Sequence, residues 1–295
     1  MSKVLTTTSL SKKYGAVHVV KDLSLEVEKG SVFGLLGPNG SGKTTTLSML
    51  LDIIPADTGA YQWFGEAPSH TNRKKIGSII ETPNFIGYLS AERNLKMVAE
   101  IKGTDAQDIA NVLETVRLTE YKDKPFNTFS LGMKQRLAIA SALLAQPEVL
   151  LLDEPTNGLD PHGIVEIRNL LMAISKKGVT IIIASHILDE IEKICTHVAI
   201  IKRGQLLVQG RVDEILTNDC ILELKANDME RLSKALKKYS LSSQITKEQD
   251  KYIVKFPSMI KNHELNEFLF GEGVVLSHLA SRKKNLELQF LEITK

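Results

Sequence analysis

One stretch of the chain has the glycine, lysine and threonine spacing of a phosphate cradle. It reads Gly37-Pro38-Asn39-Gly40-Ser41-Gly42-Lys43-Thr44 and fits the pattern G-x-x-x-x-G-K-[ST]; Thr45 follows it directly. Glycines let the backbone curl so that successive N–H groups converge on an anion, and a following helix points its N-terminus at the same anion. Lys43 adds a full positive charge, and the Thr44 hydroxyl suits Mg²⁺. The pattern predicts a nucleotide phosphate site, but it does not distinguish a kinase, a GTPase and a transport ATPase.

A second pattern is an apolar run, Val149–Leu152, that ends in the acids Asp153 and Glu154. Adjacent strand residues point to opposite faces, but the chain turns at a strand end, so both side chains can reach one cleft. Asp153 is expected to hold Mg²⁺, directly or through water, and Glu154 to act as general base on the water that attacks the γ-phosphate. The alternative is a strand-end turn with solvated charges, which the phosphate cradle makes the weaker interpretation.

Both motifs need strands and helices to position them. Ser31–Leu36 is apolar and suits a strand buried on both faces, while the apolar spacing over Lys43–Ile54 predicts a helix that Pro55 ends. Leu23–Val27 alternates as a half-buried strand. Further expected elements are helices over 90–102, 105–116, 132–144 and 163–176, strands over 76–80, 149–152 and 180–184, and a hairpin over 198–210. Nearly continuous apolar strands alternating with helices predict a parallel sheet covered on both faces, an α/β fold.

The amino-acid composition changes near residue 218. No glycine occurs between Arg211 and Phe270, and lysines become frequent. Short strand candidates lie at 221–224, 245, 252–256 and 274–279, with helix candidates at 229–239 and 263–270. We predict a first domain over residues 1–217 and a small α+β appendage over 218–295. The alternative is that these elements complete the first domain.

Composition excludes several classes of protein. Of 295 residues, 43% are hydrophobic, and 37 Lys and Arg balance 35 Asp and Glu. The apolar fraction excludes wholesale disorder, and the balanced charge argues against a nucleic-acid binder. Two cysteines without metal spacing fit a reducing cytosol. Apolar runs fall short of the ~20 residues that cross a bilayer, and no secretion signal is apparent, so any membrane role is expected through a partner.

In their order, these motifs resemble the nucleotide-binding subunit of an ABC transporter over about Leu5 to Leu216. The cradle 37–44 matches the Walker A motif, and Asp153 with Glu154 matches Walker B. The resemblance implies a P-loop NTPase fold with a mixed sheet and a helical signature subdomain over about residues 84–147. It also implies an enzyme that hydrolyses ATP with Mg²⁺.

The resemblance implies roles for further residues. Tyr14 matches the aromatic residue that stacks on adenine, Asp160 belongs to the D-loop, and His186 matches the switch histidine that contacts the γ-phosphate. Ser130 and Gly132 keep two positions of the L-S-G-G-Q signature, which in the family faces the γ-phosphate held by the other cassette. The implied assembly is a head-to-tail homodimer that sandwiches two ATP molecules.

One departure from the family pattern points to a subfamily. The family usually has glutamine after the strand corresponding to 76–80, whereas this chain has Glu81, in Glu81-Thr82-Pro83. Ionised glutamate only accepts hydrogen bonds and adds negative charge, yet it can coordinate Mg²⁺ or the attacking water. This variant and the segment Ser130–Gln135 resemble the ATPases of bacitracin and lantibiotic exporters. A surface acid without a role is the alternative.

The resemblance therefore implies a peripheral subunit at the cytoplasmic face of a bacterial membrane, with a separate integral membrane permease as partner and no nucleic acid. The apolar residues of the segment 85–89 are expected either to contact the permease or to pack in the core. Two alternatives remain open: a soluble ABC-type ATPase that acts on ribosomes or DNA, and a nucleotide-binding regulator that does not hydrolyse ATP. An intact Glu154 argues against the regulator.

Overall fold

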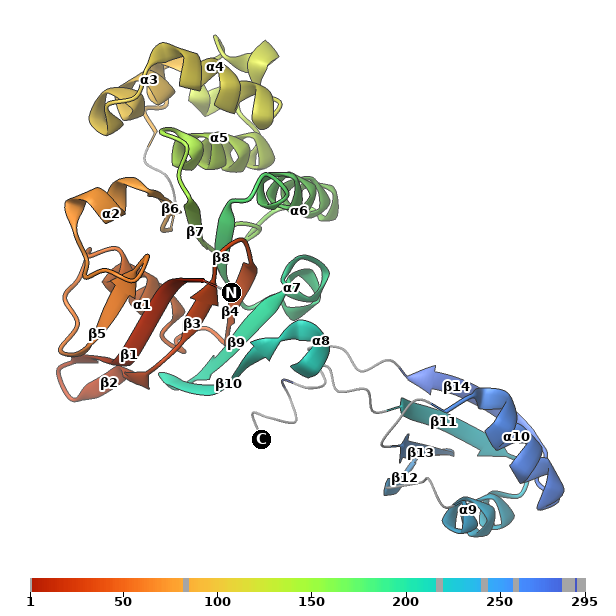
Figure 1. Cartoon of the computed structure of the whole chain (residues 1–295). Helices are drawn as coiled ribbons and strands as arrows, with labels where there is room; N and C mark the ends of the chain where they lie inside the picture. The colour runs from red at the N-terminus through yellow and green to blue at the C-terminus, as the bar shows by residue number, and fades with distance from the viewer. Residues whose placement is uncertain are drawn as a thin grey trace. The chain divides into compact units, whose positions relative to one another are not determined.

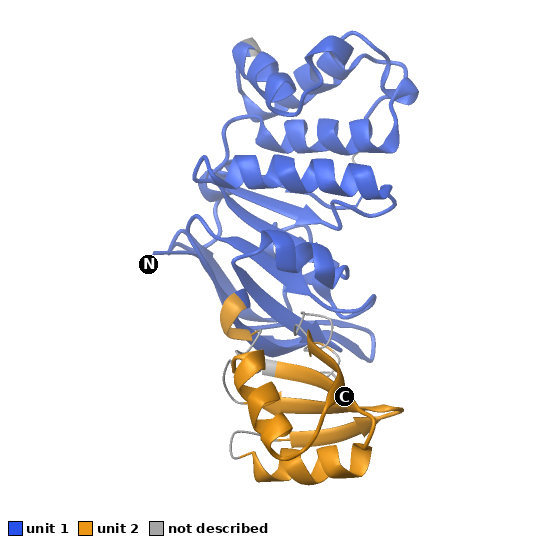
Figure 2. Cartoon of the chain, turned by 90° about the vertical axis from the view of Figure 1, so that its right-hand side faces the viewer, with its two compact units in different colours: residues 1–212 blue, residues 213–295 orange. Residues whose placement is uncertain are grey.

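The computed structural model describes residues 2–81, 85–215, 220–239, 244–256, 260–282 and 290. The chain divides into two compact units, residues 1–212 and 213–295 (Figure 2). The boundary that the sequence suggests, between residues 217 and 218, lies outside the described residues, as do Thr82, Pro83 and residue 84.

The central sheet of unit 1 places the ends of four strands at one edge. Its order is β10-β9-β4-β8-β7-β6 (Figure 1). The strands are β4 (Val32–Leu36), β6 (Ile76–Ile79), β7 (Val149–Asp153), β8 (Thr180–Ser185), β9 (His197–Lys202) and β10 (Gln205–Arg211). All neighbours pair in parallel except β9 and β10, which form the expected hairpin. Every residue of β4, β7 and β8 is buried, which explains their apolar composition. The predicted parallel sheet is confirmed.

A second, antiparallel sheet forms around the long strand β1 (Lys3–Tyr14), which pairs with β2 (Val17–Leu23), β3 (Glu26–Glu28) and β5 (Thr58–Trp63). The expected continuous strand over Leu23–Val27 is wrong, because the chain breaks between β2 and β3. There the Thr7 hydroxyl donates to the Leu23 carbonyl and accepts the Leu25 N–H, both at 2.9 Å. The Thr7 side chain thus replaces part of the backbone hydrogen bonding between the strands at this point.

Every helix expected in unit 1 is present, although the first is shorter than expected, and the helices over 70–74 and 188–194 were not predicted. They are α1 (Lys43–Leu50), α2 (His70–Lys74), α3 (Ala91–Lys102), α4 (Ala106–Thr115), α5 (Leu131–Leu143), α6 (Pro161–Ser175) and α7 (Leu188–Ile194), with 3₁₀ turns η1 (Thr119–Tyr121) and η2 (Phe126–Thr128). The helix expected over Lys43–Ile54 ends at Leu50. Asp52 adopts a left-handed backbone with φ of 60°, which an α-helix cannot continue through.

Helices α3, α4 and α5 form a helical region whose start points are capped by side chains. Ser90 and Asp105 accept backbone N–H groups at the starts of α3 and α4. Asn94, buried in α3, accepts the Ile86 N–H at 2.8 Å and donates to the carbonyls of Ile86 and Leu89 at 3.1 and 3.3 Å. One buried amide therefore fixes the segment that enters the helical region.

Unit 2 has its own core and a β-α-β-β-α-β order. The elements are β11 (Cys220–Ala226), α9 (Met229–Lys238), β12 (Gln244–Glu248), β13 (Lys251–Phe256), α10 (Asn262–Gly271) and β14 (Leu276–Arg282), preceded by the short helix α8 (Val212–Ile215). The strands form an antiparallel sheet in the order β12-β13-β11-β14. Leu222, Phe256 and Leu265 are fully buried within it. The strands and helices expected in this region are therefore present, as an α+β unit.

Candidate nucleotide site

The phosphate cradle lies between β4 and α1, as its sequence predicts. Gly42 takes a left-handed backbone with φ of 102° immediately before α1 begins at Lys43. A Cβ at Gly42 would lie 2.6 Å from the Val19 carbonyl oxygen, and one at Gly37 would lie 2.4 Å from the Ile201 carbonyl oxygen. Larger side chains are therefore excluded at both positions, because backbone atoms occupy the space.

Lys43 is folded into the cradle with its side chain only 6% exposed. Its ammonium group donates to the carbonyls of Gly37 at 2.8 Å and Pro38 at 3.3 Å, and it lies 3.5 Å from Glu154 Oε1. The cation is thus held over the loop whose backbone N–H groups are expected to bind phosphate. An outer phosphate of a bound nucleotide would replace the carbonyls of Gly37 and Pro38 as acceptors for the Lys43 ammonium.

Thr44 and Asp153 meet across the site. The Thr44 hydroxyl donates to Asp153 Oδ2 at 2.6 Å, while the buried Oδ1 has no hydrogen-bond partner within the described part of the chain. Burial raises the pKa of Asp153, opposed by the hydrogen bond from Thr44 and reinforced by the nearby charge of Glu154. A buried carboxylate oxygen beside a hydroxyl oxygen fits Mg²⁺, which takes few protein ligands and completes its shell with phosphate and water.

Glu154 is held against β8 and against His186. Its backbone is left-handed with φ of 47°, and its N–H donates to the Ala184 carbonyl at 2.9 Å. The carboxylate Oε2 lies 2.9 Å from Nδ1 of His186, the residue that follows Ser185 at the end of β8. The turn after β7 thus aims the second acid into the same edge of the sheet as the first.

Glu81 joins this edge from the end of β6. It has φ of 57° and an exposed side chain, and its negative charge contributes to the raised pKa of Asp153. Four strands therefore deliver the cradle, Glu81, the Asp153–Glu154 pair and His186 to one edge, since the carboxyl ends of parallel strands lie together.

Tyr14 stands at the end of β1 with 52% of its surface exposed. The Lys12 ammonium lies 5.8 Å from the centre of the tyrosine ring and is held by Asp57 at 2.8 Å. The ring therefore offers an open face on which a flat base can stack. In the described part of the chain, no hydrogen bond joins Tyr14 to the cradle.

Ser130, Gly132 and Asp160 stand at helix starts. Ser130 caps α5 by accepting the Met133 N–H at 3.3 Å, and Asp160 caps α6 by accepting the Gly163 N–H at 2.8 Å. Leu131 is 49% exposed, and a Cβ at Gly132 would meet no atom within 4 Å. Among the described residues, no hydrogen bond or ion pair joins these three residues to the cradle. Ser130 and Gly132 stand at the tip of α5, whereas Asp160 stands at the start of a different helix, α6.

An ion pair behind the site has no signal in the sequence. Arg168 of α6 donates to Glu190 of α7 at 2.9 Å, and both side chains are less than one-fifth exposed. The pair fixes α7, which begins two residues after His186. The two residues lie 22 positions apart in separate helices, so no local pattern relates them.

Fold and site together define a P-loop nucleoside triphosphatase. Residues 20–157 match the family model of the ABC transporter. The chain is 38% identical to the bacitracin transport ATP-binding protein BcrA of Bacillus licheniformis, over 99% of this chain and 98% of that protein. It is 37% identical to the lantibiotic transport ATP-binding protein SrtF of Streptococcus pyogenes, over 75% of this chain and 99% of that protein.

Comparison with solved structures also finds a component of an ABC transporter. The structure of cbiO1 from Clostridium perfringens, part of the ABC transporter complex cbiONQ, matches with a TM-score of 0.66 and 30% identity over 73% of this chain and 91% of that one. The chain belongs to the ABC transporter ATP-binding family and is an ATPase. The resemblance, the fold class and the enzymatic activity predicted from the sequence are confirmed. No helix in the described ranges is both long and apolar enough to cross a membrane.

Proposed function

We propose that this ATPase energises the export of an antimicrobial peptide, such as bacitracin or a lantibiotic, or of another hydrophobic drug, through a separate membrane permease. Two relatives named for bacitracin transport and for lantibiotic transport support this proposal. In this proposal the subunit is a peripheral protein at the cytoplasmic face of a bacterial membrane, because the cargo crosses the membrane through the permease.

The residues of the site divide the chemistry among them. Lys43 and the N–H groups of the cradle bind the phosphates, and Tyr14 stacks on the adenine. Thr44 and Asp153 would hold Mg²⁺, with Glu81 beside them; when bound, the ion neutralises charge on the outer phosphates. Glu154 orients the attacking water and accepts its proton. His186 holds the Glu154 carboxylate at 2.9 Å and reaches the γ-phosphate.

Two copies complete each other's sites in this proposal. The observation that carries it is the exposed tip of α5, where the Ser130 hydroxyl and the backbone N–H groups near Gly132 make no hydrogen bond to the chain's own cradle among the described residues. A helix N-terminus favours an anion. With two-fold symmetry, each tip meets the γ-phosphate held by the other copy, and Asp160 lies at the same interface. ATP therefore favours the closed dimer, and loss of the γ-phosphate releases it.

The segment 85–89 is the proposed contact with the permease. Tyr88 is 78% exposed, and Asn94 holds the backbone on either side of it. Phe85 instead packs edge-on against Phe126, with ring centroids 5.0 Å apart. We assign the contact to Tyr88 and a packing role to Phe85.

Light scattering of the Glu154→Gln variant tests the dimer. With ATP and Mg²⁺ the variant should double its mass, and with ADP it should return to a monomer. A strictly monomeric variant at high concentration, with ATP bound, would contradict the proposal. Co-expression with a candidate integral membrane permease tests the transport role, since a ribosome- or DNA-acting ATPase would not co-purify with it.

A further inference from the structure

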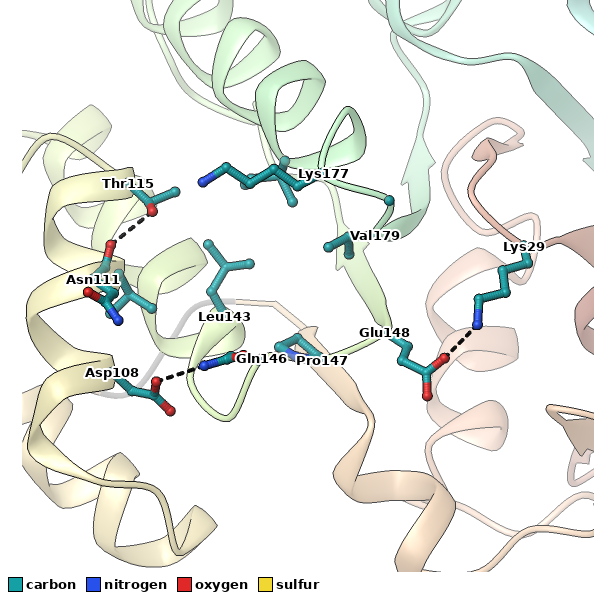
Figure 3. Close-up of a pocket in the computed structure, with 13 residues that line it drawn as sticks. Lys29, Asp108, Asn111, Thr115, Leu143, Gln146, Pro147, Glu148, Lys177 and Val179 are labelled. Atoms are coloured by element: carbon teal, nitrogen blue, oxygen red, sulfur yellow. Dashed lines mark hydrogen bonds and ion pairs between the residues drawn. The ribbon is translucent and has the colours of Figure 1, made fainter.

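We propose that a cleft between the helical region and α6 binds an amphipathic organic anion, with an aliphatic body and a carboxylate head. The cleft consists of two adjoining cavities of about 530 and 140 Å³ that share Thr115 at the end of α4. We call it the α6 cleft. Figure 3 shows the larger cavity, with Lys177 extending from the end of α6 toward Thr115.

One face of α6 lines both cavities. The lining residues on this helix and the turn that follows it are Glu166, Asn169, Leu170, Ala173, Ile174 and Lys177. Their spacing of three and four residues puts them on a single stripe. The helical region therefore leaves a continuous hollow along this stripe.

The floor of the larger cavity is apolar. Val112, Leu143, Ile174 and Val179 line it, and Val112 and Ile174 are buried. Its volume falls within the range of about 300–1,000 Å³ that is usual for small-molecule sites. The floor accepts an aliphatic body, which a free nucleotide or inorganic phosphate lacks.

In the larger cavity both acids have partners, whereas one lysine has none among the described residues; the acid of the smaller cavity, Glu166, lies 3.9 Å from His162. Glu148 is paired with Lys29 at 2.9 Å, and Asp108 accepts Gln146 at 3.1 Å. Hydrogen bonds lower the pKa of both carboxyls, from Thr104 and then Gln146 for Asp108 and from Lys29 for Glu148, so both acids are ionised at neutral pH. Within the residues that the structure covers, no hydrogen bond or ion pair engages the Lys177 ammonium. An incoming carboxylate is the complement that it lacks.

The smaller cavity adds a cation with one unsatisfied donor. Arg136 lines it, and its Nε is buried with no hydrogen-bond partner in the described structure. Its Nη1 donates to the carbonyls of Val116 at 3.5 Å and of Arg117 at 3.4 Å. A buried donor without an acceptor is costly, so the arginine also favours an anionic occupant.

The α6 cleft is separate from the nucleotide site. Glu148 and Val179 stand just before β7 and β8, whereas Asp153 and Ser185 are at the opposite ends of the same strands. Binding in the cleft is therefore independent of the proposed transport function.

Calorimetric titration of the nucleotide-free full chain with decanoate tests the proposal. We expect saturable binding of one decanoate, while decanol and decyltrimethylammonium bind at least about tenfold more weakly because they lack the negative head. Lys177→Glu should weaken decanoate binding by about tenfold or more. The matched control is Lys176→Glu, an exposed neighbour that does not line the cleft and should bind as the wild type does.

Three results would overturn the assignment: no saturable binding of decanoate, equal binding of decanol, or equal loss in the two lysine variants. Both variants should retain wild-type ATP turnover, which reports intact folding. Retained turnover with lost decanoate binding in Lys177→Glu separates the cleft from the nucleotide site.

Discussion

The Glu154→Gln substitution tests the assignment of the general base. Glutamine keeps the length of the side chain but cannot accept the proton of the attacking water, so turnover should fall by about 10²–10⁴-fold, or about 3–5 kcal/mol. Nucleotide affinity should stay equal or rise. The lost carboxylate lies 3.5 Å from the Lys43 ammonium, where it competes with the phosphates for the same cation.

Phosphate release measured in a single turnover gives the rate, and titration with a fluorescent ATP analogue gives the Kd. Glu264→Gln is the matched control, since this exposed carboxylate on α10 pairs with the neighbouring Lys261, at 3.4 Å. A Glu154→Gln rate within about threefold of the wild type would refute the base assignment. A variant that no longer bound ATP would refute the argument from competing charge.

Three further perturbations probe the surroundings of the site. Tyr14→Ala should raise the KM for ATP in steady-state assays by roughly five- to a hundredfold, because stacking on one base contributes about 1–3 kcal/mol. Tyr14→Phe keeps the ring and should leave the KM unchanged. An unchanged KM in the alanine variant would mean that the adenine binds elsewhere. Burial lowers the pKa of Lys102 to about 8 from 10.5, so the unfolded chain binds more protons between these values. Wild-type stability in urea should therefore rise with pH across that range relative to Lys102→Met, and parallel pH profiles would contradict this. Arg168→Met removes the pair with Glu190 and should lower kcat about tenfold through a displaced His186, with the KM for ATP unchanged; a change in KM alone would argue against a positioning role.

The placement of the site residues was largely predictable because it is encoded locally. The cradle is one contiguous segment, and Asp153 with Glu154 directly follows an apolar strand. His186 follows a second such strand, and parallel strands bring such ends together without further information. The alternation of apolar strands and amphipathic helices likewise predicted the α/β fold.

Features that depend on distant residues could not be predicted in this way. The break between β2 and β3 comes from the Thr7 side chain, 16 and 18 positions away from its partners Leu23 and Leu25. The end of α1 depends on the left-handed Asp52, whose residue type alone does not require that backbone. Strand order and the α6 cleft arise from packing between segments, for which a single sequence carries no signal.

Mixing two inactive variants tests the shared site most directly. Lys43→Ala damages the cradle of its own copy, and Ser130→Arg damages the tip offered to the other copy. In the mixed dimer, the Ser130→Arg copy supplies an intact cradle and the Lys43→Ala copy an intact tip. The account predicts that ATP turnover, absent in each variant alone, returns on mixing to roughly a quarter of the wild-type sites. If the mixture stays as inactive as its components, or if Ser130→Arg alone hydrolyses ATP at the wild-type rate, the site is not shared.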